Sequence, residues 1–308
     1  MRKAKTALAV VLTLCLSGGP AAASSEAPAE NTAPVAENLE LETYRGVSVG
    51  GQLTAYDAEG DEVTFTLETE PLKGSVDLSP DGFFVYTPGE NRRGRDYFGF
   101  RVTDAAGNAS QEGTVIIRLV KQKTRAAYAD MEGDPLEYAA VALTEAGVFT
   151  GEGVGTVRVF SPDALVSRGE FLSMCMNAAG CELLQGVKST GFQDDDAIAP
   201  WLKPYVATAL LRGYIQGSST ETGAVFRPED PVTLRDACVM LNAVLGVTDV
   251  VSASAMAEDG AVSRDAQAVA NLTSSRVMPA RWEDLDESLT RGQAAELLQN
   301  AMDLLSRR

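Results

Sequence analysis

The sequence contains no histidine and only four cysteines among its 308 residues. Without histidine the chain cannot form a Ser-His-Asp triad, a histidine-ligated zinc site or a histidine-ligated haem. Basic residues are also scarce, with 26 Lys and Arg against 43 Asp and Glu and a formal net charge of -17. Because a protein that binds nucleic acid needs a surface rich in Lys and Arg, this balance argues against nucleic acid as a partner.

Long apolar runs are missing beyond the first residues of the chain. That start has the three parts of a secretory signal: basic residues within the first five positions, an apolar run over 7–16 and small residues at 21–23. We therefore predict a signal peptide at 1–23 and an exported chain. No later stretch is long and apolar enough to span a membrane, so no transmembrane segment is predicted in the mature chain.

Three cysteines remain after removal of the predicted signal, namely Cys175, Cys181 and Cys238. An odd number is atypical of a disulfide framework in an exported protein. With no histidine to act as a base, catalysis by a thiol is disfavoured, and the cysteines are predicted to be buried within helices.

The segment from 38 to 121 has the alternating pattern of β-strands. Apolar and polar residues alternate around Phe65, Phe100 and Ile117, as they do in strands with one buried face. Turn-forming runs separate these segments, so we predict about seven short strands and an all-β sandwich. Residues 24–37 are rich in Ala, Ser, Pro and Glu, and this composition predicts a flexible linker.

Three segments of the predicted sandwich carry a family resemblance. They read Asp-Ala-Glu-Gly-Asp at 57–61, Asp-Gly-Phe-Phe-Val-Tyr-Thr-Pro at 81–88 and Val-Thr-Asp-Ala-Ala-Gly-Asn at 102–108. With these segments the region resembles the immunoglobulin-like and cadherin-like modules of bacterial surface proteins. The resemblance implies an immunoglobulin-like sandwich.

Two interpretations of the acidic turns in this region stay open. Carboxylate and amide oxygens suit a hard cation such as Ca²⁺, and the resemblance makes calcium the one cofactor considered. Asp, Gly and Asn are also the residues that tight turns require for their own hydrogen bonds and backbone angles. The candidate calcium ligands are Asp57, Glu59, Asp61, Asp104 and Asn108.

From about residue 122 the apolar residues recur at intervals of three and four, which indicates helices. A first helix is predicted to begin after Asp134 and Pro135 and to end at Gly147. Ser167 and Glu170 have the spacing of a capping box, which predicts the start of a second helix.

This pair of helices recurs along the chain. An aromatic-x-Asp segment at 128–130 recurs at 192–194, and Phe-x-Pro at 160–162 recurs at 226–228. In a third, shorter copy, the first half lacks both the tryptophan and the Phe-x-Pro of the second copy. The segments that open the last helix of each copy begin at 166, 232 and 289. Such a period indicates a repeat architecture.

With these motifs the chain from 122 to 308 resembles a triplet of S-layer homology (SLH) domains. The predicted fold class is multi-domain, with an all-β immunoglobulin-like sandwich followed by an all-α bundle of three SLH helix-loop-helix repeats. The resemblance implies that the bundle holds secondary cell-wall polysaccharide or peptidoglycan without a covalent bond. The predicted divisions are 1–23, 24–37, 38–121, 122–186, 187–248 and a degenerate 249–308.

The candidate glycan-binding residues lie at the starts of helices. Arg168 and Arg291 directly follow the capping residues Ser167 and Thr290, where the positive end of the helix dipole disfavours an arginine. We predict that these arginines and the unpaired N–H groups beside them bind an anionic glycan, for example a pyruvylated one. The alternative is that the arginines lie in solvent or pair with neighbouring acids.

Other candidate residues depart from this pattern. Arg235 is displaced by one residue from the equivalent position, which Leu234 occupies, so binding there is uncertain. Trp201 is included as a candidate glycan contact, although aromatic residues on helices usually belong to a core. From the sequence we expect that replacing both Arg168 and Arg291 by alanine weakens wall binding without lowering stability.

The predicted function is that of a noncatalytic cell-surface protein, anchored to cell-wall polysaccharide by the SLH triplet and displaying the sandwich. Two alternatives are an adhesin and a surface-layer structural subunit, in which the sandwich binds a partner that the sequence does not identify. A third is an accessory part of a surface hydrolase system. No segment of catalytic-domain size remains in the sequence after the two predicted regions, so catalysis is not predicted.

Overall fold

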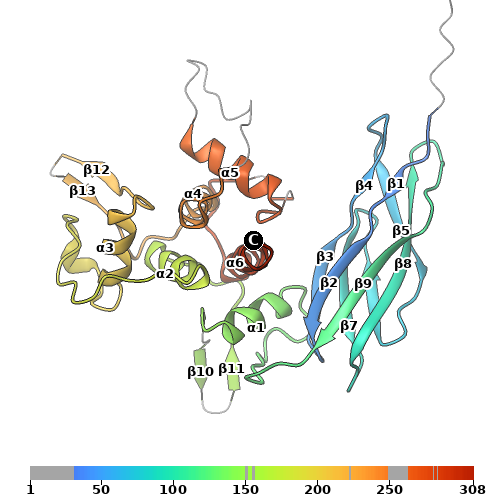
Figure 1. The fold of residues 1–308 in the computed structure, drawn as a ribbon, viewed down its shortest axis with the longest axis horizontal. Coiled ribbons are helices and arrows are strands. Elements are labelled where there is room, and N and C mark those ends of the chain that lie inside the picture. Colours follow the sequence, from blue (N-terminus) through green and yellow to red (C-terminus); the bar gives the residue numbers. More distant parts are fainter. Residues whose placement is uncertain are drawn as a thin grey trace, which may run out of the picture.

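The computed structural model describes residues 31–149, 152–154, 157–221, 223–248, 263–279, 281–282 and 284–308. The predicted signal at 1–23 lies outside these residues. The described chain forms a β-sandwich and a mainly helical region that lie side by side (Figure 1).

The sandwich has two main sheets and one short ribbon. A four-stranded sheet has the order β2-β9-β8-β5, a three-stranded sheet has the order β3-β7-β6, and β1 pairs with β4. Every neighbouring pair is antiparallel except β2 and β9, which run parallel. The strands are β1 (Val35–Ala36), β2 (Leu39–Tyr44), β3 (Val49–Gln52), β4 (Ala55–Tyr56), β5 (Val63–Thr69), β6 (Gly74–Leu78), β7 (Phe83–Pro88), β8 (Gly94–Asp104) and β9 (Gly113–Val120).

The core of the sandwich follows the alternation seen in the sequence. Phe98, Phe100 and Val102 on β8 are fully buried, and the ring of Phe84 meets that of Phe98 edge to face at 5.1 Å. The β-rich prediction for this region is confirmed. The predicted linker at 24–37 is corrected at its end, because β1 lies within it and pairs with β4.

The second region contains α1 (Glu137–Glu145), α2 (Arg168–Ala178), α3 (Lys203–Leu211), α4 (Leu234–Leu245), α5 (Arg264–Ser274), α6 (Arg291–Ser306) and the 3-10 turn η1 (Asp195–Ala197). It is not all-α as predicted. Two antiparallel hairpins interrupt it: β10 (Glu152–Val154) with β11 (Val157–Val159), and β12 (Ser218–Thr220) with β13 (Gly223–Val225). Their strands have only three residues each, too few to show a period in the sequence.

The first helix begins after Asp134 and Pro135, as predicted, and its N-cap is Leu136. Asp134 and Pro135 lie before α1, because the Asp134 carboxylate accepts a hydrogen bond from the N–H of Leu136 in a turn and the helix begins at Glu137. α5 begins at Arg264.

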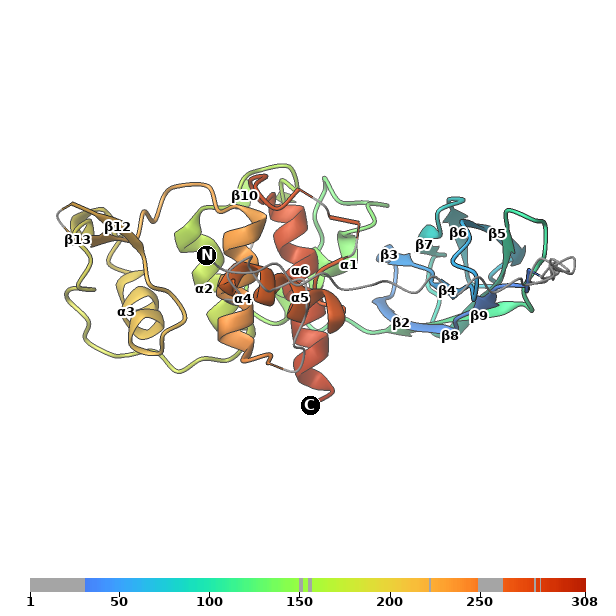
Figure 2. The same ribbon diagram turned by 90° about the horizontal axis from the view of Figure 1, so that it is seen from above.

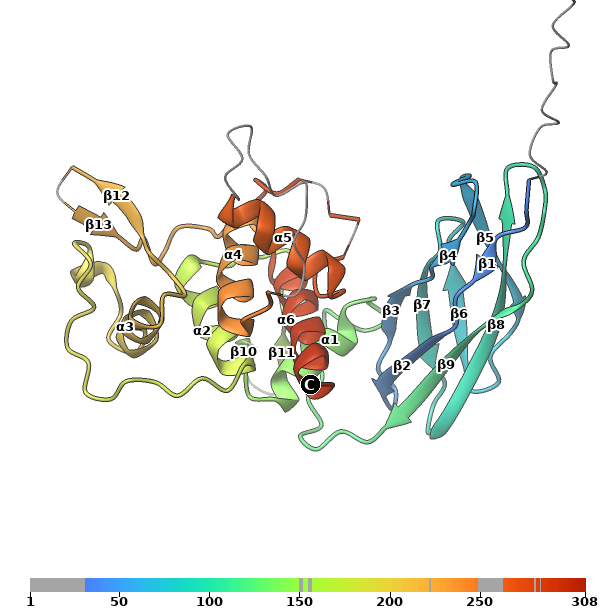
Figure 3. The ribbon, with the colours of Figure 1, turned by 45° about the horizontal axis from the view of Figure 1, so that its top comes forward.

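The helices form three pairs, which we call unit 1 (α1 and α2), unit 2 (α3 and α4) and unit 3 (α5 and α6). The second helices lie at the centre, where α2 packs against α4 and α6. Each first helix packs on the second helix of a different unit: α1 on α6, α3 on α2 and α5 on α4. Figure 1 shows α2, α4 and α6 end-on with the first helices around them, and Figures 2 and 3 show α3 and its hairpin farthest from the sandwich.

Backbone hydrogen bonds join the three units into a closed ring. The N–H of Val166 donates to the carbonyl of Leu289 at 3.0 Å, the N–H of Leu289 to that of Val232 at 2.8 Å, and the N–H of Val232 to that of Val166 at 2.9 Å. One residue just before each central helix contributes, so the units are related by an approximate threefold arrangement. The ring is complete within one chain.

The repeated aspartates explain two of the sequence motifs. The carboxylate of Asp194 accepts hydrogen bonds from the N–H groups of Phe226 at 2.9 Å and Arg227 at 2.7 Å. Asp130 makes the equivalent bonds to Phe160 and Ser161 in unit 1. Ser161 and Arg227 have positive φ angles of 58° and 57°, which are unfavourable for these residues. Each aspartate therefore stabilises a strained turn of the Phe-x-Pro segment.

The prediction that the cysteines are buried within helices is confirmed for Cys175 and Cys238 and wrong for Cys181, which follows the end of α2. Cys175 and Cys238 are buried in α2 and α4, whereas Cys181 is only partly buried. Burial raises the pKa of the Cys175 thiol and raises that of Cys238 to about 12. Both thiols are therefore protonated at neutral pH.

The sandwich and unit 1 are joined by a polar contact. The N–H of Gly50 donates to the carbonyl of Pro135 at 2.8 Å, and the N–H of Tyr138 donates to the carbonyl of Ser48 at 3.1 Å. The buried Glu137 carboxylate accepts from the N–H of Ser48 at 2.9 Å. The ring of Tyr44 lies 5.3 Å from that of Tyr138, between centroids. These contacts hold the sandwich against α1.

Candidate functional site

The predicted caps are present at all three central helices. The side chains of Ser167, Thr233 and Thr290 each accept a hydrogen bond from the N–H three residues later. Ser167 with Glu170, and Thr290 with Gln293, form complete capping boxes. The hydroxyls of Ser167 and Thr290 therefore accept hydrogen bonds within their own helices.

The N–H groups that follow the caps are already bonded. In α2, the N–H of Arg168 donates to the carbonyl of Asp230 and that of Gly169 to the carbonyl of Pro228, both at 2.9 Å. In α6, the N–H of Arg291 donates to Ala164 at 2.7 Å and that of Gly292 to Pro162 at 2.8 Å. The expectation that unpaired N–H groups bind an anion here is therefore wrong. Carbonyls of another unit occupy these donors.

Arg168 is held by groups of unit 2. Its side chain is only 13% exposed and forms an ion pair with Asp236, whose side chain is 49% exposed. Its Nε donates to the carbonyl of Phe226 at 3.2 Å, and its guanidinium carbon lies 5.7 Å from the centre of the Phe226 ring. The alternative stated from the sequence, pairing with a neighbouring acid, describes this arginine.

Arg291 occupies the corresponding place between units 3 and 1. Its Nη1 donates to the carbonyl of Phe160 at 2.7 Å, and its guanidinium lies 5.3 Å from the centre of the Phe149 ring. Arg168 and Arg291 therefore both donate to the carbonyl of a Phe-x-Pro phenylalanine in the adjoining unit. Two of the three contacts between units thus share one arrangement.

The third contact differs, as Leu234 in the arginine position suggested. Leu234 is buried, and Arg235 turns toward unit 3, where it pairs with Asp265 and Asp286 at 2.8 Å each. The hydrogen bonds that Arg235 donates to Asp286 and, to a smaller extent, to Asp265 raise the pKa of its guanidinium. Arg235 thus reinforces the contact between units 2 and 3.

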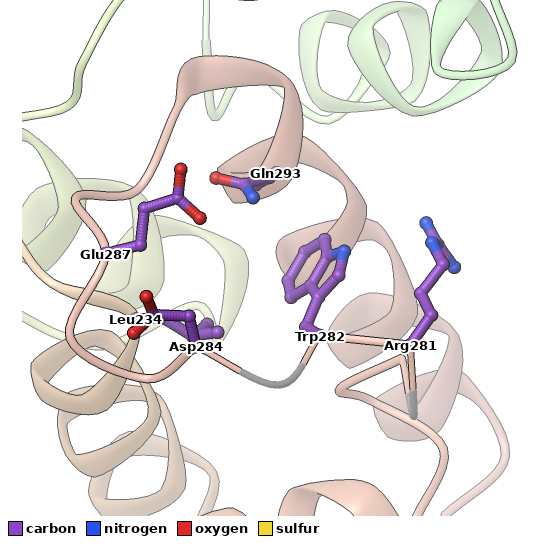
Figure 4. A pocket seen from close by; sticks show the side chains of 6 residues that line it. All are labelled: Leu234, Arg281, Trp282, Asp284, Glu287 and Gln293. Carbon is purple, nitrogen blue, oxygen red and sulfur yellow. The ribbon is translucent and has the colours of Figure 1, made fainter.

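Between these two units lies a groove of about 130 Å³ that the sequence did not indicate. Figure 4 shows the Glu287 carboxylate facing Gln293 on one side of the groove and the Trp282 ring beside them. Arg281 points away from Glu287 and pairs with Glu296 at 2.6 Å. The residues lining the groove are Leu234, Arg281, Trp282, Asp284, Glu287 and Gln293.

Trp201 is not a core residue. It is 56% exposed, and its ring meets that of Tyr205 at 6.3 Å between centroids. The next residue, Leu202, packs against the start of α2, where a Cβ at Gly169 would lie 2.5 Å from its Cδ2. Trp201 therefore offers an exposed aromatic face one residue from the contact between units 1 and 2.

The acidic turns of the sandwich come together at one end. Asp57 Oδ1 accepts from the N–H groups of Glu59 and Asp61 at 3.1 and 2.9 Å. Asp104 accepts from the N–H and the Nδ2 of Asn108 at 2.8 and 2.9 Å. Desolvation raises the pKa of Asp104, but the hydrogen bonds that it accepts from Asn108 lower the pKa by more, so the net shift is downward. These bonds are the ones that the turn interpretation requires.

Asn31, which the sequence analysis did not select, links two of the predicted ligands. Its Nδ2 donates to Asp61 at 2.9 Å and to Asp104 at 3.3 Å. Asn31 Oδ1 and Asp57 Oδ2 are buried without a hydrogen-bond partner, whereas Glu59 binds the hydroxyl of Thr32. Across the described part of the chain, no group of three or more acidic, Cys or His side chains is placed to hold a metal ion.

Family models match two parts of the chain. The bacterial cadherin-like domain matches residues 31–121, and the S-layer homology domain matches residues 191–238. The chain therefore contains a cadherin-like domain and an SLH domain, whereas the resemblance predicted three SLH domains. The SLH match falls on unit 2 and extends into α4.

A curated relative and several solved structures are similar to parts of the chain. The "Surface-layer 125 kDa protein" of Lysinibacillus sphaericus is 29% identical over 123 residues, which cover 40% of this chain and 10% of that protein. The chain thus spans about a tenth of the relative's length. In the described residues, no helix is long and apolar enough to cross a membrane.

Two solved structures have low overall similarity to the chain. A mutant of the SrpA adhesin from Streptococcus sanguinis has a TM-score of 0.25 at 20% identity, covering 33% of this chain and 64% of that one. Fibronectin(III)-like modules of CbhA from Clostridium thermocellum have a TM-score of 0.22 at 16% identity, covering 32% and 52%.

Proposed function

We propose that this chain is a noncatalytic protein of the cell surface that holds wall polysaccharide noncovalently through units 1 to 3 and displays the sandwich. The SLH domain and the surface-layer relative support a wall-anchoring protein of the cell surface. The proposal adds that all three units are SLH repeats, divided at 122–186, 187–248 and 249–308. The closed ring of hydrogen bonds among Val166, Val232 and Leu289 supports this division.

The observation that carries the proposal is the shared environment of Arg168 and Arg291. Both guanidiniums lie at a contact between units, beside an aromatic ring. The partner of Arg168, Asp236, is half exposed and can turn into solvent. A carboxylate or phosphate of the glycan would then replace it, because a guanidinium binds either group in the same forked geometry. Trp201 would supply an apolar face for a sugar ring.

The experiment is cosedimentation of the mature chain with purified wall sacculi, before and after chemical removal of the secondary polymer. Binding that is lost on removal supports an anionic secondary polysaccharide. Binding that survives identifies peptidoglycan as the ligand. A chain that stays in the supernatant with both preparations contradicts the proposal.

Matched variants locate the site in the same assay. Asp236→Asn keeps the shape of the side chain but removes the charge that competes for Arg168, so we expect tighter binding. Arg227→Gln changes an exposed arginine outside the pairs described above and serves as the control. Equal binding by wild type, Asp236→Asn and Arg227→Gln contradicts the role of the Arg168 site.

A surface-layer structural subunit is the second candidate function. It is favoured by the printed name of the relative, which is a surface-layer protein. Ordered two-dimensional arrays formed by purified protein on sacculi support it. Uniform coating of the sacculi without a lattice favours the simpler anchored protein.

We also propose that the acidic end of the sandwich binds calcium. The unpartnered oxygens of Asp57 and Asn31 support this proposal, since oxygen ligands are those that Ca²⁺ prefers. Addition of calcium should raise the melting temperature of the wild-type chain but not that of Asp57→Asn. An unchanged midpoint in excess calcium and in chelator leaves only the turn function of these residues.

A further inference from the structure

The sandwich separates its charges between its two ends. One end, which we call the junction end, comprises 44–48, 72–74, 87–95 and 118–121, where β2 and β9 finish and β8 begins. Within these ranges the basic residues are Arg45, Lys73, Arg92, Arg93, Arg95, Arg118 and Lys121 and the one acidic residue is Glu90, while the buried carboxylate of Asp96 adjoins them. The opposite end has no Lys or Arg within 53–62, 79–82 and 104–112, and its acids are Asp57, Glu59, Asp61, Glu62, Asp81, Asp104 and Glu112.

Most cations of the junction end are available to a ligand. Arg95 and Arg118 form exposed pairs with acids of β2, at 3.9 and 3.4 Å, and such pairs are weak. Among the residues that the structure describes, Arg45, Arg92 and Arg93 form no ion pair, and each is exposed. A cluster of uncompensated positive charge therefore lies on a chain whose formal charge is -17.

A groove of about 250 Å³ adjoins these cations. Leu72, which is 77% exposed, and Pro88 give it apolar surface, Ser75 and Thr87 contribute hydroxyls, and Arg92 is its free cation. This combination suits a sugar, because a pyranose ring has an apolar face and a rim of hydroxyl groups.

The groove is held open by a buried carboxylate. Asp96 accepts hydrogen bonds from the N–H groups of Leu72 at 3.1 Å and Lys73 at 2.8 Å, and from the hydroxyl of Tyr86 at 2.8 Å. The ammonium of Lys73 in turn donates to the carbonyls of Arg93 and Arg95. The two loops are thereby fixed to each other, so the groove exists before any ligand binds.

We propose that the junction end binds an anionic polysaccharide, with acidic groups on Arg45, Arg92 and Arg93 and a sugar ring in the groove beside Leu72. The net negative charge of the chain does not prevent this. The 11 residues of β8 separate the two ends by about 34 Å, whereas charges in physiological salt are screened over about 8 Å. The inference rests on the proposed function, since the wall is the source of such a polymer.

The test measures binding of the mature chain to two soluble anionic polymers, poly(glycerol phosphate) and polygalacturonate, by affinity electrophoresis, with neutral dextran as the control polymer. Arg92→Gln with Arg93→Gln removes two cations from the junction end. Lys188→Gln with Arg307→Gln removes two exposed cations from the helical region and is the matched control. We expect the first variant to lose at least tenfold in affinity for an anionic polymer and the control to lose less than twofold.

Salt provides a second readout. If the three contacts at Arg45, Arg92 and Arg93 each release about 0.7 of a counterion, as for flexible single-stranded polyanions, raising salt from about 50 to 200 mM weakens wild-type binding on the order of 20-fold. The double variant keeps one of these contacts, which reduces that factor to about threefold. A variant with the same salt dependence as wild type contradicts the assignment.

Each outcome separates this inference from the proposed function. If binding to an anionic polymer depends on Arg92 and Arg93 but the chain ignores sacculi, the inference holds and the wall anchor is wrong. If no anionic polymer is retained, or both double variants behave alike, the inference fails while sacculus binding is judged on its own. Retention only on vesicles containing phosphatidylglycerol overturns the polysaccharide in favour of a membrane surface.

Discussion

Replacing Arg168 by alanine should destabilise the helical region, contrary to what the sequence led us to expect. The side chain donates a hydrogen bond to the carbonyl of Phe226, pairs with Asp236 and lies over the Phe226 ring. The hydrogen bond contributes about 1 kcal/mol, the pair about 1 kcal/mol after allowance for the exposure of Asp236, and the ring contact about 0.5 to 1 kcal/mol. Removing the guanidinium from the positive end of the helix dipole regains about 0.5 kcal/mol, which offsets part of this loss.

The expected loss is therefore about 2 kcal/mol in the free energy of unfolding. It is measured by urea denaturation followed by far-ultraviolet circular dichroism, with the slope of the transition checked for constancy. Arg227→Ala removes an exposed arginine from the turn that contains Phe226. It should change the free energy of unfolding by less than about 0.5 kcal/mol.

A double-mutant cycle separates the ion pair from the rest. Asp236→Ala alone and combined with Arg168→Ala should give a coupling energy of about 1 kcal/mol. If Arg168→Ala leaves the midpoint unchanged, the contacts around its guanidinium contribute nothing to stability. That result would support the expectation from the sequence, in which Arg168 contributes to ligand binding and not to stability.

Three further changes test other parts of the structure. Asp194→Ala removes the acceptor for two N–H groups of a strained turn and should lower the free energy of unfolding by about 2 to 4 kcal/mol. Replacing the exposed Asp196 by alanine should change it very little, and equal urea midpoints for the two variants contradict the role of Asp194. Gly50→Ala places a Cβ 2.8 Å from that of Pro135, so trypsin should cut the segment between sandwich and α1 faster than in wild type, and an unchanged rate argues against a fixed junction. Burial raises the pKa of Glu137 from its usual 4.5, so the folded chain keeps this proton to higher pH than the unfolded chain, and the stability due to Glu137 falls as pH rises through the two pKa values. The difference in unfolding free energy between wild type and Glu137→Gln should therefore change between pH 4 and 8, and a constant difference refutes the coupling.

Much of the local structure could be predicted because its causes are local. Alternation around Phe100 depends only on the two-residue period of a strand, and the capping boxes at Ser167 and Thr290 depend on residues three positions apart. The repeated Asp and Phe-x-Pro segments were recognisable for the same reason, although their hydrogen bonds were not. The hairpin β10–β11 escaped notice because three-residue strands have too little pattern.

The candidate site was predicted only in part, because its environment is built from distant segments. The sequence placed Arg168 after a cap, but it could not show that carbonyls of 228 and 230 bond the helix N–H groups. It could not decide whether Trp201 is a glycan contact or a core residue, because helical aromatics usually pack, whereas in the described structure the side chain is 56% exposed. Asn31 was overlooked because its partners lie 30 and 73 positions away.

The sequence by itself determined the succession of a strand-rich segment and three helix pairs, since side-chain period and capping act over a few residues. Only the tertiary structure decided that the three pairs close into a ring, that the arginines face carbonyls and rings of another unit, and that one end of the sandwich is basic and the other acidic. Those features depend on strand register and on which helices meet, and both follow from burying apolar faces that belong to segments far apart in the chain.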